Sequence, residues 1–431
     1  MTEREIKYEA FVRDDIANNR GRMVNAMAEV EYLLAHPEAC EIFSRHYLDA
    51  ILSYATAFSE FYRPYRGFKS LQDFPIITKT IMKENWDAIA VPEYDSVLKE
   101  KRTSGSTGTP FRVVLDKYKH SRLIATLKVV RASVGVLSHE KTLFVSGSVR
   151  WKTPIPQERQ ERDNVYYVDS GFMDSDSVGA FIKRLSDENF RTMTAMASHL
   201  DRIAYLAEHK QLPEWTGDFI AVFSTSEALK ESTREIISEY FRCPVYSFYG
   251  NEENGMFSFE DGSGLGQRVN TADFFFEVLK MDSDTPADEG ELGRLVITDL
   301  FNKAFPMIRY ENGDLVAKKT MDDGRVYFTQ VAGRKADMLY ATDGRMIQFF
   351  AAASFLRKFI DIKQFQVIQE DYHNFTLILN TDNRSYEEEM VRQLRSVFGE
   401  DSYYKFEYVD EIPKLRSGKH RMTVCKIPGV N

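Results

Sequence analysis

The chain has 431 residues, and its 56 Lys and Arg residues against 65 Asp and Glu residues give a formal net charge of −9 at neutral pH. An acidic chain without a basic block does not bind a phosphate backbone by bulk charge, so a nucleic-acid binder of that kind is excluded. Hydrophobic residues make up 43% and charged residues 28%, an ordinary globular composition. The length predicts two or three domains.

No segment predicts a membrane span or a secretory signal. The longest apolar run, residues 346–356, is much shorter than the roughly 20 residues that cross a bilayer. The N-terminus alternates charges and has no apolar stretch after a basic start. We therefore expect a cytoplasmic protein. The cysteines are too far apart in the sequence for a disulfide framework or a metal cluster, and they are Cys40, Cys243 and Cys425.

The chain begins with a helical pattern, from residue 3 to about residue 62, in which Met23, Met27 and Val30 recur on one face. Thr78 is placed to cap a short helix that begins at Lys79.

Next come predicted strands in which apolar residues form continuous runs and do not alternate with polar ones, each before or after a helical stretch. This pattern is typical of parallel strands that are buried on both faces. After residue 271 the pattern changes to hairpins. The fold class predicted is α/β, with a large N-terminal domain containing α/β sheets and a small β-barrel-like antiparallel layer, plus a small mobile α+β C-terminal domain. The predicted strands are 142–147, 219–226, 244–250, 273–280, 294–300, 314–319 and 325–330.

The last hundred or so residues form a pattern of their own, with strands 365–370, 375–380 and 404–409 around a helix over residues 386–398. We place a boundary near Gly333, which predicts a nucleotide- and acid-binding domain over residues 1–332 and a lid domain over residues 333–431.

The segment RTSGSTGTPF, residues 102–111, has the composition of a phosphate-binding loop. Glycines let the backbone approach an oxyanion, and hydroxyl and amide groups donate hydrogen bonds to it. A flexible surface loop of the same composition is the alternative. Gly108 is followed by Thr, Pro and Phe, so this is not a P-loop of the Gly-Lys-Ser/Thr kind. A cation for the phosphates must come from elsewhere, and Lys419 in SGKH is the candidate.

Several segments in order resemble motifs of the adenylate-forming enzyme superfamily, nearest to the branch of phenylacetate-CoA ligase and capsular polysaccharide biosynthesis proteins. TSGSTGTP resembles the phosphate loop, STSEAL the nucleotide-base loop, and FYGNEENG the Tyr-Gly-x-Thr-Glu segment. ITDLFNKAFPMIRYENGDL resembles the stretch that ends in Gly-Asp, GRKADML the hinge, and IPKLRSGKHR the loop of the catalytic lysine.

The resemblance implies a role for each matching residue. Lys419 would be catalytic, Glu253 would bind Mg²⁺, Tyr249 would stack on adenine, and Asp314 would accept hydrogen bonds from the ribose. Without the resemblance, each would be read as an ordinary loop, core or turn residue. The remaining implied nucleotide contacts are Thr103, Ser104, Gly105, Ser106, Thr107, Gly108, Ser226, Glu227, Ala228, Gly250 and Arg334.

The chain departs from the family pattern at three places. Glu252 stands where the family has Thr, Ala336 replaces the first Asp of the hinge, and the segment after Gly344 does not match the CoA-using members. CoA is therefore one candidate acceptor beside other nucleophiles.

The function implied is ATP-dependent adenylation of a small-molecule carboxylic acid, with release of pyrophosphate and transfer of the acyl group to a thiol, amine or hydroxyl. The cofactors expected are ATP, Mg²⁺ and, for thiol transfer, CoA. A phosphotransferase or ATPase that cleaves the γ-phosphate, and a non-catalytic nucleotide-binding protein, are the alternatives. A homodimer is one assembly that the sequence leaves open.

Overall fold

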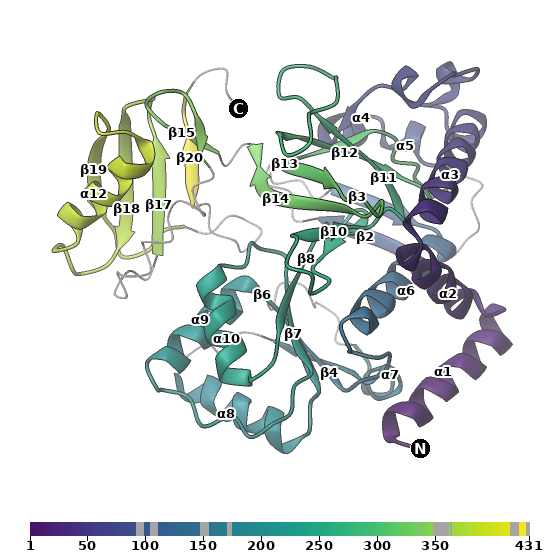
Figure 1. Ribbon diagram of the computed structural model, residues 1–431, viewed down its shortest axis with the longest axis horizontal. Coiled ribbons are helices and arrows are strands. Elements are labelled where there is room, and N and C mark those ends of the chain that lie inside the picture. Colours follow the sequence, from purple (N-terminus) through teal and green to yellow (C-terminus); the bar gives the residue numbers. More distant parts are fainter. Residues whose placement is uncertain are drawn as a thin grey trace.

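The computed structural model describes residues 1–91, 99–103, 111–146, 155–169, 175–335, 338–347, 362, 364–413 and 422–427. It consists of a large body, which holds the N-terminal helices and a long mixed sheet, and a smaller unit formed by the C-terminal part of the chain (Figure 1). Among these residues, no helix has the length and apolar character that crossing a bilayer requires.

Three helices begin the chain, as predicted: α1 (Glu3–Asn19), α2 (Arg22–Ala35) and α3 (Pro37–Phe58). The Thr2 side chain caps α1 by accepting a hydrogen bond from the backbone N of Glu5 at 3.2 Å. Of the apolar stripe predicted for this region, Val30 is buried on α2, whereas Met23 and Met27 are half-buried. The buried residues of α2 are Ala26, Val30, Leu33 and Leu34.

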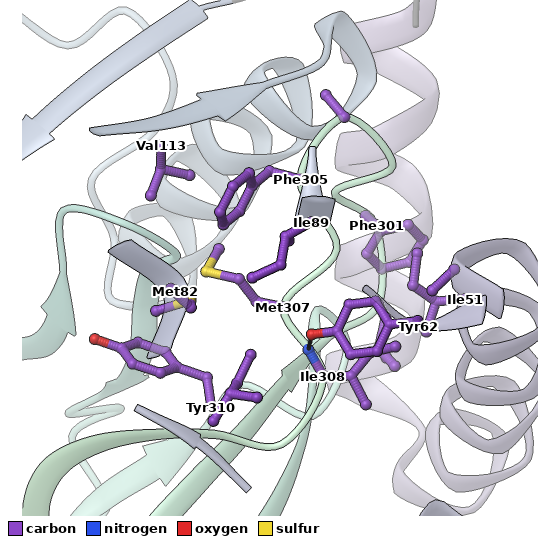
Figure 2. Packing of buried hydrophobic residues seen from close by; sticks show 14 of the residues in the cluster. Ile51, Tyr62, Met82, Ile89, Val113, Phe301, Phe305, Met307, Ile308 and Tyr310 are labelled. Atoms are coloured by element: carbon purple, nitrogen blue, oxygen red, sulfur yellow. Dashed lines mark hydrogen bonds between the residues drawn. The ribbon is translucent and has the colours of Figure 1, made fainter. Parts of the chain in front are cut away.

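Short elements follow α3 and close over a large apolar cluster. Thr78 caps α4 as predicted, because its Oγ1 accepts a hydrogen bond from the backbone N of Ile81 at 3.4 Å. Within the cluster, the buried hydroxyl of Tyr62 donates to the carbonyl of Pro306 at 3.3 Å and accepts from the backbone N of Ile308 (Figure 2). These bonds fix the loop before β13 (Tyr310–Thr320) to the segment that follows α3. The elements are η1 (Arg63–Tyr65), η2 (Leu71–Asp73), β1 (Ile77–Thr78), α4 (Lys79–Glu84) and α5 (Trp86–Ile89).

The parallel half of the long sheet has the α/β pattern predicted from the buried strands. Helices α8, α9 and α10 cover one face of it, and α6 lies on the other (Figure 1). Its strands are β4 (Thr142–Ser146), β5 (Val165–Asp169), β6 (Thr192–Met196), β7 (Ala221–Thr225) and β8 (Val245–Asn251). The helices of this half are α6 (Lys117–Ser133), α7 (Gln157–Asp163), α8 (Ser175–Asp187), α9 (Ala197–Glu208) and α10 (Glu231–Phe241).

The antiparallel half contains the predicted hairpins, and it is hydrogen-bonded to the parallel half through β8. That strand pairs in parallel with β7 and antiparallel with β9, so the two halves form one continuous path of strands. The strands of the antiparallel half are β9 (Gly255–Phe259), β10 (Gln267–Val269), β11 (Phe274–Leu279), β12 (Leu292–Asp299), β13 (Tyr310–Thr320) and β14 (Val326–Arg334). A separate pair is formed by β2 (Lys99–Thr103) and β3 (Phe111–Leu115).

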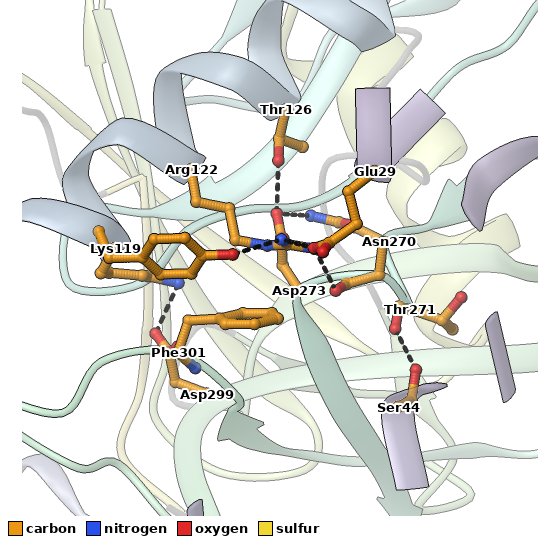
Figure 3. Close-up of polar contacts among 12 residues, drawn as sticks. Glu29, Ser44, Lys119, Arg122, Thr126, Asn270, Thr271, Asp273, Asp299 and Phe301 are labelled. Carbon is orange, nitrogen blue, oxygen red and sulfur yellow. Dashed lines mark hydrogen bonds and ion pairs between the residues drawn. The ribbon is translucent and has the colours of Figure 1, made fainter. Parts of the chain in front are cut away.

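Buried ion pairs fix α6 to the antiparallel half and to α2 (Figure 3). The Arg122 guanidinium contacts the carboxylates of Asp273 and Glu29, and the Lys119 ammonium lies 2.7 Å from Asp299. Each buried cation faces a buried or half-buried carboxylate. The attraction between the two charges offsets the cost of removing them from water.

The smaller unit has the strand and helix pattern predicted for the C-terminal residues. Its four-stranded sheet has the order β19-β18-β17-β20, and α12 packs on it through Met390, Leu394 and Phe398. The body strand β14 runs on to Arg334, so the boundary between residues 332 and 333 stays a prediction. The elements are β15 (Leu339–Tyr340), β16 (Met346–Ile347), β17 (Gln364–Gln369), β18 (Asn374–Asn380), α12 (Glu387–Phe398), β19 (Tyr403–Tyr408) and β20 (Thr423–Cys425).

Candidate active site

Two residues from separate motifs meet where β8 and β13 approach each other. The Tyr249 hydroxyl donates a hydrogen bond to Asp314 Oδ2 at 2.6 Å. Asn312 Nδ2 donates to the same carboxylate oxygen at 2.7 Å and to the Tyr249 hydroxyl at 3.1 Å. Burial and the neighbouring Asp314 charge hold the pKa of Tyr249 well above its ordinary value, so the phenol remains a donor. The two predicted nucleotide contacts thus form one polar cluster.

Arg334 lies beside this cluster on the neighbouring strand. It is the register partner of Asp314 in the β13–β14 ladder, and its Nε lies 4.0 Å from Asp314 Oδ1. The Arg334 side chain is 59% exposed, so its guanidinium extends from the strand toward solvent. A cation and a carboxylate therefore stand together at this edge of the sheet.

Glu253, the predicted metal ligand, is buried and ion-paired. Its Oε1 accepts a hydrogen bond from Lys79 Nζ at 2.7 Å. Lys79 is the first residue of α4, and β1 directly before it pairs in parallel with β13 at Ile77↔Tyr310. Burial raises the pKa of Tyr310 well above its ordinary value, and the charges of Glu253 and Asp314 raise it further. Strand β13 thus connects the Asp314 cluster with Glu253.

Glu253 offers a metal ion a single carboxylate, and that carboxylate is paired with Lys79. Among the residues that the structure describes, no group of three His, Cys, Asp or Glu side chains is arranged to hold one. Mg²⁺ in nucleotide sites takes one or two carboxylates and completes its shell with phosphate and water oxygens. Glu253 fits that limited role. The Glu252 carboxylate, where the family has Thr, lies 3.7 Å from Lys101 Nζ at the start of the predicted phosphate loop.

The predicted base loop follows β7 and has a constrained backbone. Ser226 has φ of 71°, an uncommon conformation for a residue with a side chain. Glu227 Oε2 accepts a hydrogen bond from the backbone N of Ser198 at 3.0 Å, in the first turn of α9. The Glu227 carboxylate therefore ties the loop to α9, while the side chains of Ser226 and Ala228 are exposed.

Gly250 is required by the fold of β8 and β9. A Cβ at this position would lie 2.1 Å from the carbonyl oxygen of Gly255, and the ladder shifts register between Tyr249 and Gly250. The backbone after Tyr249 can therefore take this course only with glycine at position 250.

The predicted phosphate loop lies only partly within the residues that the structure describes. Thr103 ends β2 and is the register partner of Phe111 in β3. The Phe111 ring centroid lies 5.4 Å from Lys79 Nζ, which places the start of β3 beside the Glu253 pair. Ser104, Gly105, Ser106, Thr107, Gly108 and Lys419 lie outside the described residues.

Reasoning from the sequence missed Lys79, Asn312 and Tyr310. Lys79 was read only as the first residue of a helix, and Asn312 only as part of a turn. The pairing of β1 with β13 joins residues more than 200 positions apart, and no local pattern indicates it.

Known proteins share parts of this chain and its fold. Residues 339–426 match the CapK C-terminal domain family. The chain is 25% identical to Protein CapK of Staphylococcus aureus over 376 residues, which cover 83% of this chain and 81% of that protein. Among solved structures, a 2-hydroxyisobutyryl-CoA ligase in the postadenylation state with 2-HIB-AMP superposes with a TM-score of 0.68, at 16% identity over 93% of this chain and 89% of that one.

The chain has the adenylate-forming ligase fold. An anthranilate CoA ligase, AuaEII, in complex with anthranoyl-AMP also superposes, with a TM-score of 0.55 and 15% identity over 75% of this chain and 65% of that one. The predicted fold class and the predicted resemblance to the adenylate-forming superfamily are thus confirmed. The residue roles that the resemblance implies are not tested by these similarities.

Proposed function

We propose that the protein activates a carboxylic acid with ATP, forming an acyl-adenylate and pyrophosphate, and then transfers the acyl group to CoA or another nucleophile. The observation that carries this proposal is the hydrogen bond between Tyr249 and Asp314, 2.6 Å long, which joins two motifs that are 65 residues apart. The superposed ligases contain acyl-adenylates, 2-HIB-AMP and anthranoyl-AMP. In its more specific form, the proposal is that the acid is of the phenylacetate type.

The described residues supply distinct parts of the chemistry. Asp314 would accept hydrogen bonds from the ribose hydroxyls, Tyr249 would cover the adenine, and Arg334 would reach the ribose or the phosphates. Asn312 keeps the Asp314 carboxylate oriented. Charge-assisted hydrogen bonds of this kind are the stronger ones in binding sites, so Asp314 is the anchor for the nucleoside.

Glu253 and Lys79 would act on the phosphates. A bound Mg²⁺, held by Glu253, would neutralise charge on the phosphate oxygens during attack by the carboxylate of the acid. Lys79 Nζ donates a hydrogen bond to Glu253 Oε1 at 2.7 Å, and the Lys79 side chain is 32% exposed. Glu253 would hold the metal ion, which supplies charge neutralisation at the phosphates, and Lys79 would add a second positive charge beside it.

Lys419 is the proposed catalytic residue, and the lid domain of residues 333–431 would carry it to the phosphates. Two anions must approach in line, and a cation near 4 Å offsets about 4 kcal/mol of their repulsion at an effective dielectric of about 20. That offset corresponds to nearly a thousandfold in rate.

Purified protein with Mg²⁺, ATP and a panel of carboxylic acids tests the proposal. Acid-dependent release of pyrophosphate and AMP, with trapping of the acyl group by hydroxylamine as a hydroxamate, is expected. Formation of ADP instead would support a phosphotransferase or ATPase. Binding of ATP without turnover of any acid in the panel would support a non-catalytic nucleotide-binding protein.

A further inference from the structure

Two consecutive acidic residues occupy the turn between β8 and β9, and a lysine from another element lies against each of them. Glu253 accepts a hydrogen bond from Lys79 Nζ at 2.7 Å. The Glu252 carboxylate lies 3.7 Å from Lys101 Nζ on β2. The turn thus holds two negative charges beside two positive ones.

The two ion pairs differ in burial. The Glu253 side chain is 5% exposed, so Lys79 compensates its charge inside the protein. The side chains of Glu252 and Lys101 are 35% and 33% exposed and keep contact with solvent. An ion pair of that exposure contributes little to folding. The effect of Lys101 on Glu252 is therefore expected in the electrostatic potential of the site and not in the stability of the fold.

The Lys101 pair is close to the predicted phosphate loop, which lies between β2 and β3 in the sequence. Lys101 stands two residues before Thr103, which ends β2 and is the register partner of Phe111 at the start of β3. The Phe111 ring centroid lies 5.4 Å from Lys79 Nζ. Phosphates bound by this loop would therefore approach both lysines and the acidic turn.

Several cations of this region act on His120 of α6. Burial lowers the pKa of the His120 imidazole to about 4, and the charges of three basic side chains lower it further, namely Lys101, Lys99 and Arg159. A positive potential of this kind attracts phosphates. The Glu252 carboxylate opposes it, and the ion pair with Lys101 limits that opposition.

We propose that Lys101 is a positioning residue for the nucleotide: its ammonium neutralises Glu252, so that the polyphosphate of ATP can bind beside the acidic turn. This role rests on the proposed function and assigns a further residue to its triphosphate site. Without Lys101, the Glu252 carboxylate would face the phosphates uncompensated, and like charges repel. Without both charges the repulsion is absent, and this distinguishes the role from a direct contact of Lys101 with ATP.

Calorimetric titration of the full chain with ATP and with AMP, in the presence of Mg²⁺, tests this role. We expect Lys101→Met to weaken ATP binding about tenfold and AMP binding less than about threefold, because the repulsion grows with the charge of the ligand. Lys101→Arg keeps the charge and should bind ATP as the wild type does. The double variant with Lys101→Met and Glu252→Gln should bind ATP to within about threefold of the wild type.

Arg112→Met is the matched control, because Arg112 belongs to the same β2–β3 pair of strands and lies 3.9 Å from Glu100. It removes a positive charge but leaves the pair of Lys101 with Glu252 in place, so ATP affinity should stay within about twofold. The urea midpoint of each variant shows whether a loss of affinity reflects a loss of fold. If Lys101→Met does not fold, Lys101→Gln takes its place in every comparison.

An equal loss of affinity for ATP and for AMP in Lys101→Met would overturn this role, since a loss that ignores the phosphate charge is structural. Failure of Glu252→Gln to restore ATP binding would also overturn it, because Lys101 would then contact the phosphates itself. Absence of ATP binding to the wild type would contradict both this role and the proposed function. The expected rescue without acid-dependent release of pyrophosphate would contradict the adenylation but leave the role of Lys101 standing.

Discussion

The carboxylate of Asp314 is constrained by two side chains and one strand register. It accepts from Tyr249 and Asn312, and its backbone N donates to Asn312 Oδ1 at 3.0 Å. Replacement by Asn keeps the shape but removes the negative charge that would receive the ribose hydroxyls. We expect Asp314→Asn to lower kcat/KM for ATP roughly ten- to hundredfold, the value of one charge-assisted hydrogen bond. Asp322→Asn, an exposed change in the turn after the same strand, should leave it unaffected.

The ion pair of Lys79 with Glu253 is expected to contribute to the free energy of unfolding. Glu253 is buried while Lys79 is 32% exposed, so the coupling is expected to lie between that of a surface pair and that of a fully buried one. A double-mutant cycle with Lys79→Met and Glu253→Gln, measured by urea unfolding, should give a coupling free energy of about 1–2 kcal/mol.

The exposed pair of Arg45 with Glu41 supplies the reference cycle, for which we expect less than about 0.5 kcal/mol. A coupling at Lys79 and Glu253 no larger than this reference would mean that the two charges are not held together in solution.

Helix α6 carries a buried arginine that is paired with carboxylates, Arg122, and a half-buried arginine, Arg131, and the difference between them is measurable at the scale of the element. Arg122→Met leaves the buried Asp273 without its partner, so the free energy of unfolding should fall by roughly 3–5 kcal/mol. Arg131→Met removes a half-buried charge that has no carboxylate within 4.0 Å among the described residues, and it should be neutral or stabilising. Urea unfolding of both variants checks this contrast. A loss of stability at Arg131 as large as that at Arg122 would contradict this difference between the two positions.

The elements differ in how far the sequence could predict them. Thr78 and the helix after it, the strands β4, β7 and β8 and the C-terminal helix are set by local patterns, namely a cap, apolar runs and a repeating stripe, whereas β5 and β6 were not predicted. The pairing of β1 with β13 and the ion pairs of α6 depend on residues far apart in the chain. The same division holds in the candidate site, where motifs indicated Tyr249 and Asp314 but nothing indicated Lys79.

At the scale of the whole molecule, the proposed mechanism requires the C-terminal unit to move relative to the body. In the described part of the chain, a small apolar cluster links them. In this cluster, Leu315 and Ala332 of the body pack with Met338 and Met346 of the C-terminal unit. Met338 directly precedes β15, and Met346 is the first residue of β16. Small interfaces between domains permit relative motion, and a cluster of methionines adapts readily to a new packing. This arrangement is compatible with a unit that moves relative to the body.

The movement makes a selective prediction about Lys419. If the C-terminal unit brings this residue to the phosphates for adenylation and then turns away, Lys419→Ala should abolish exchange of pyrophosphate into ATP by at least about a hundredfold, the order of a lost charge contact in the transition state. Transfer from a supplied acyl-adenylate should remain, because that step takes place after the lysine has left. Lys426→Ala, which removes an exposed lysine of the same unit paired with Glu370, is the matched control and should leave both half-reactions intact. Equal loss of the two half-reactions in Lys419→Ala would contradict the movement, since one fixed arrangement would then serve both steps.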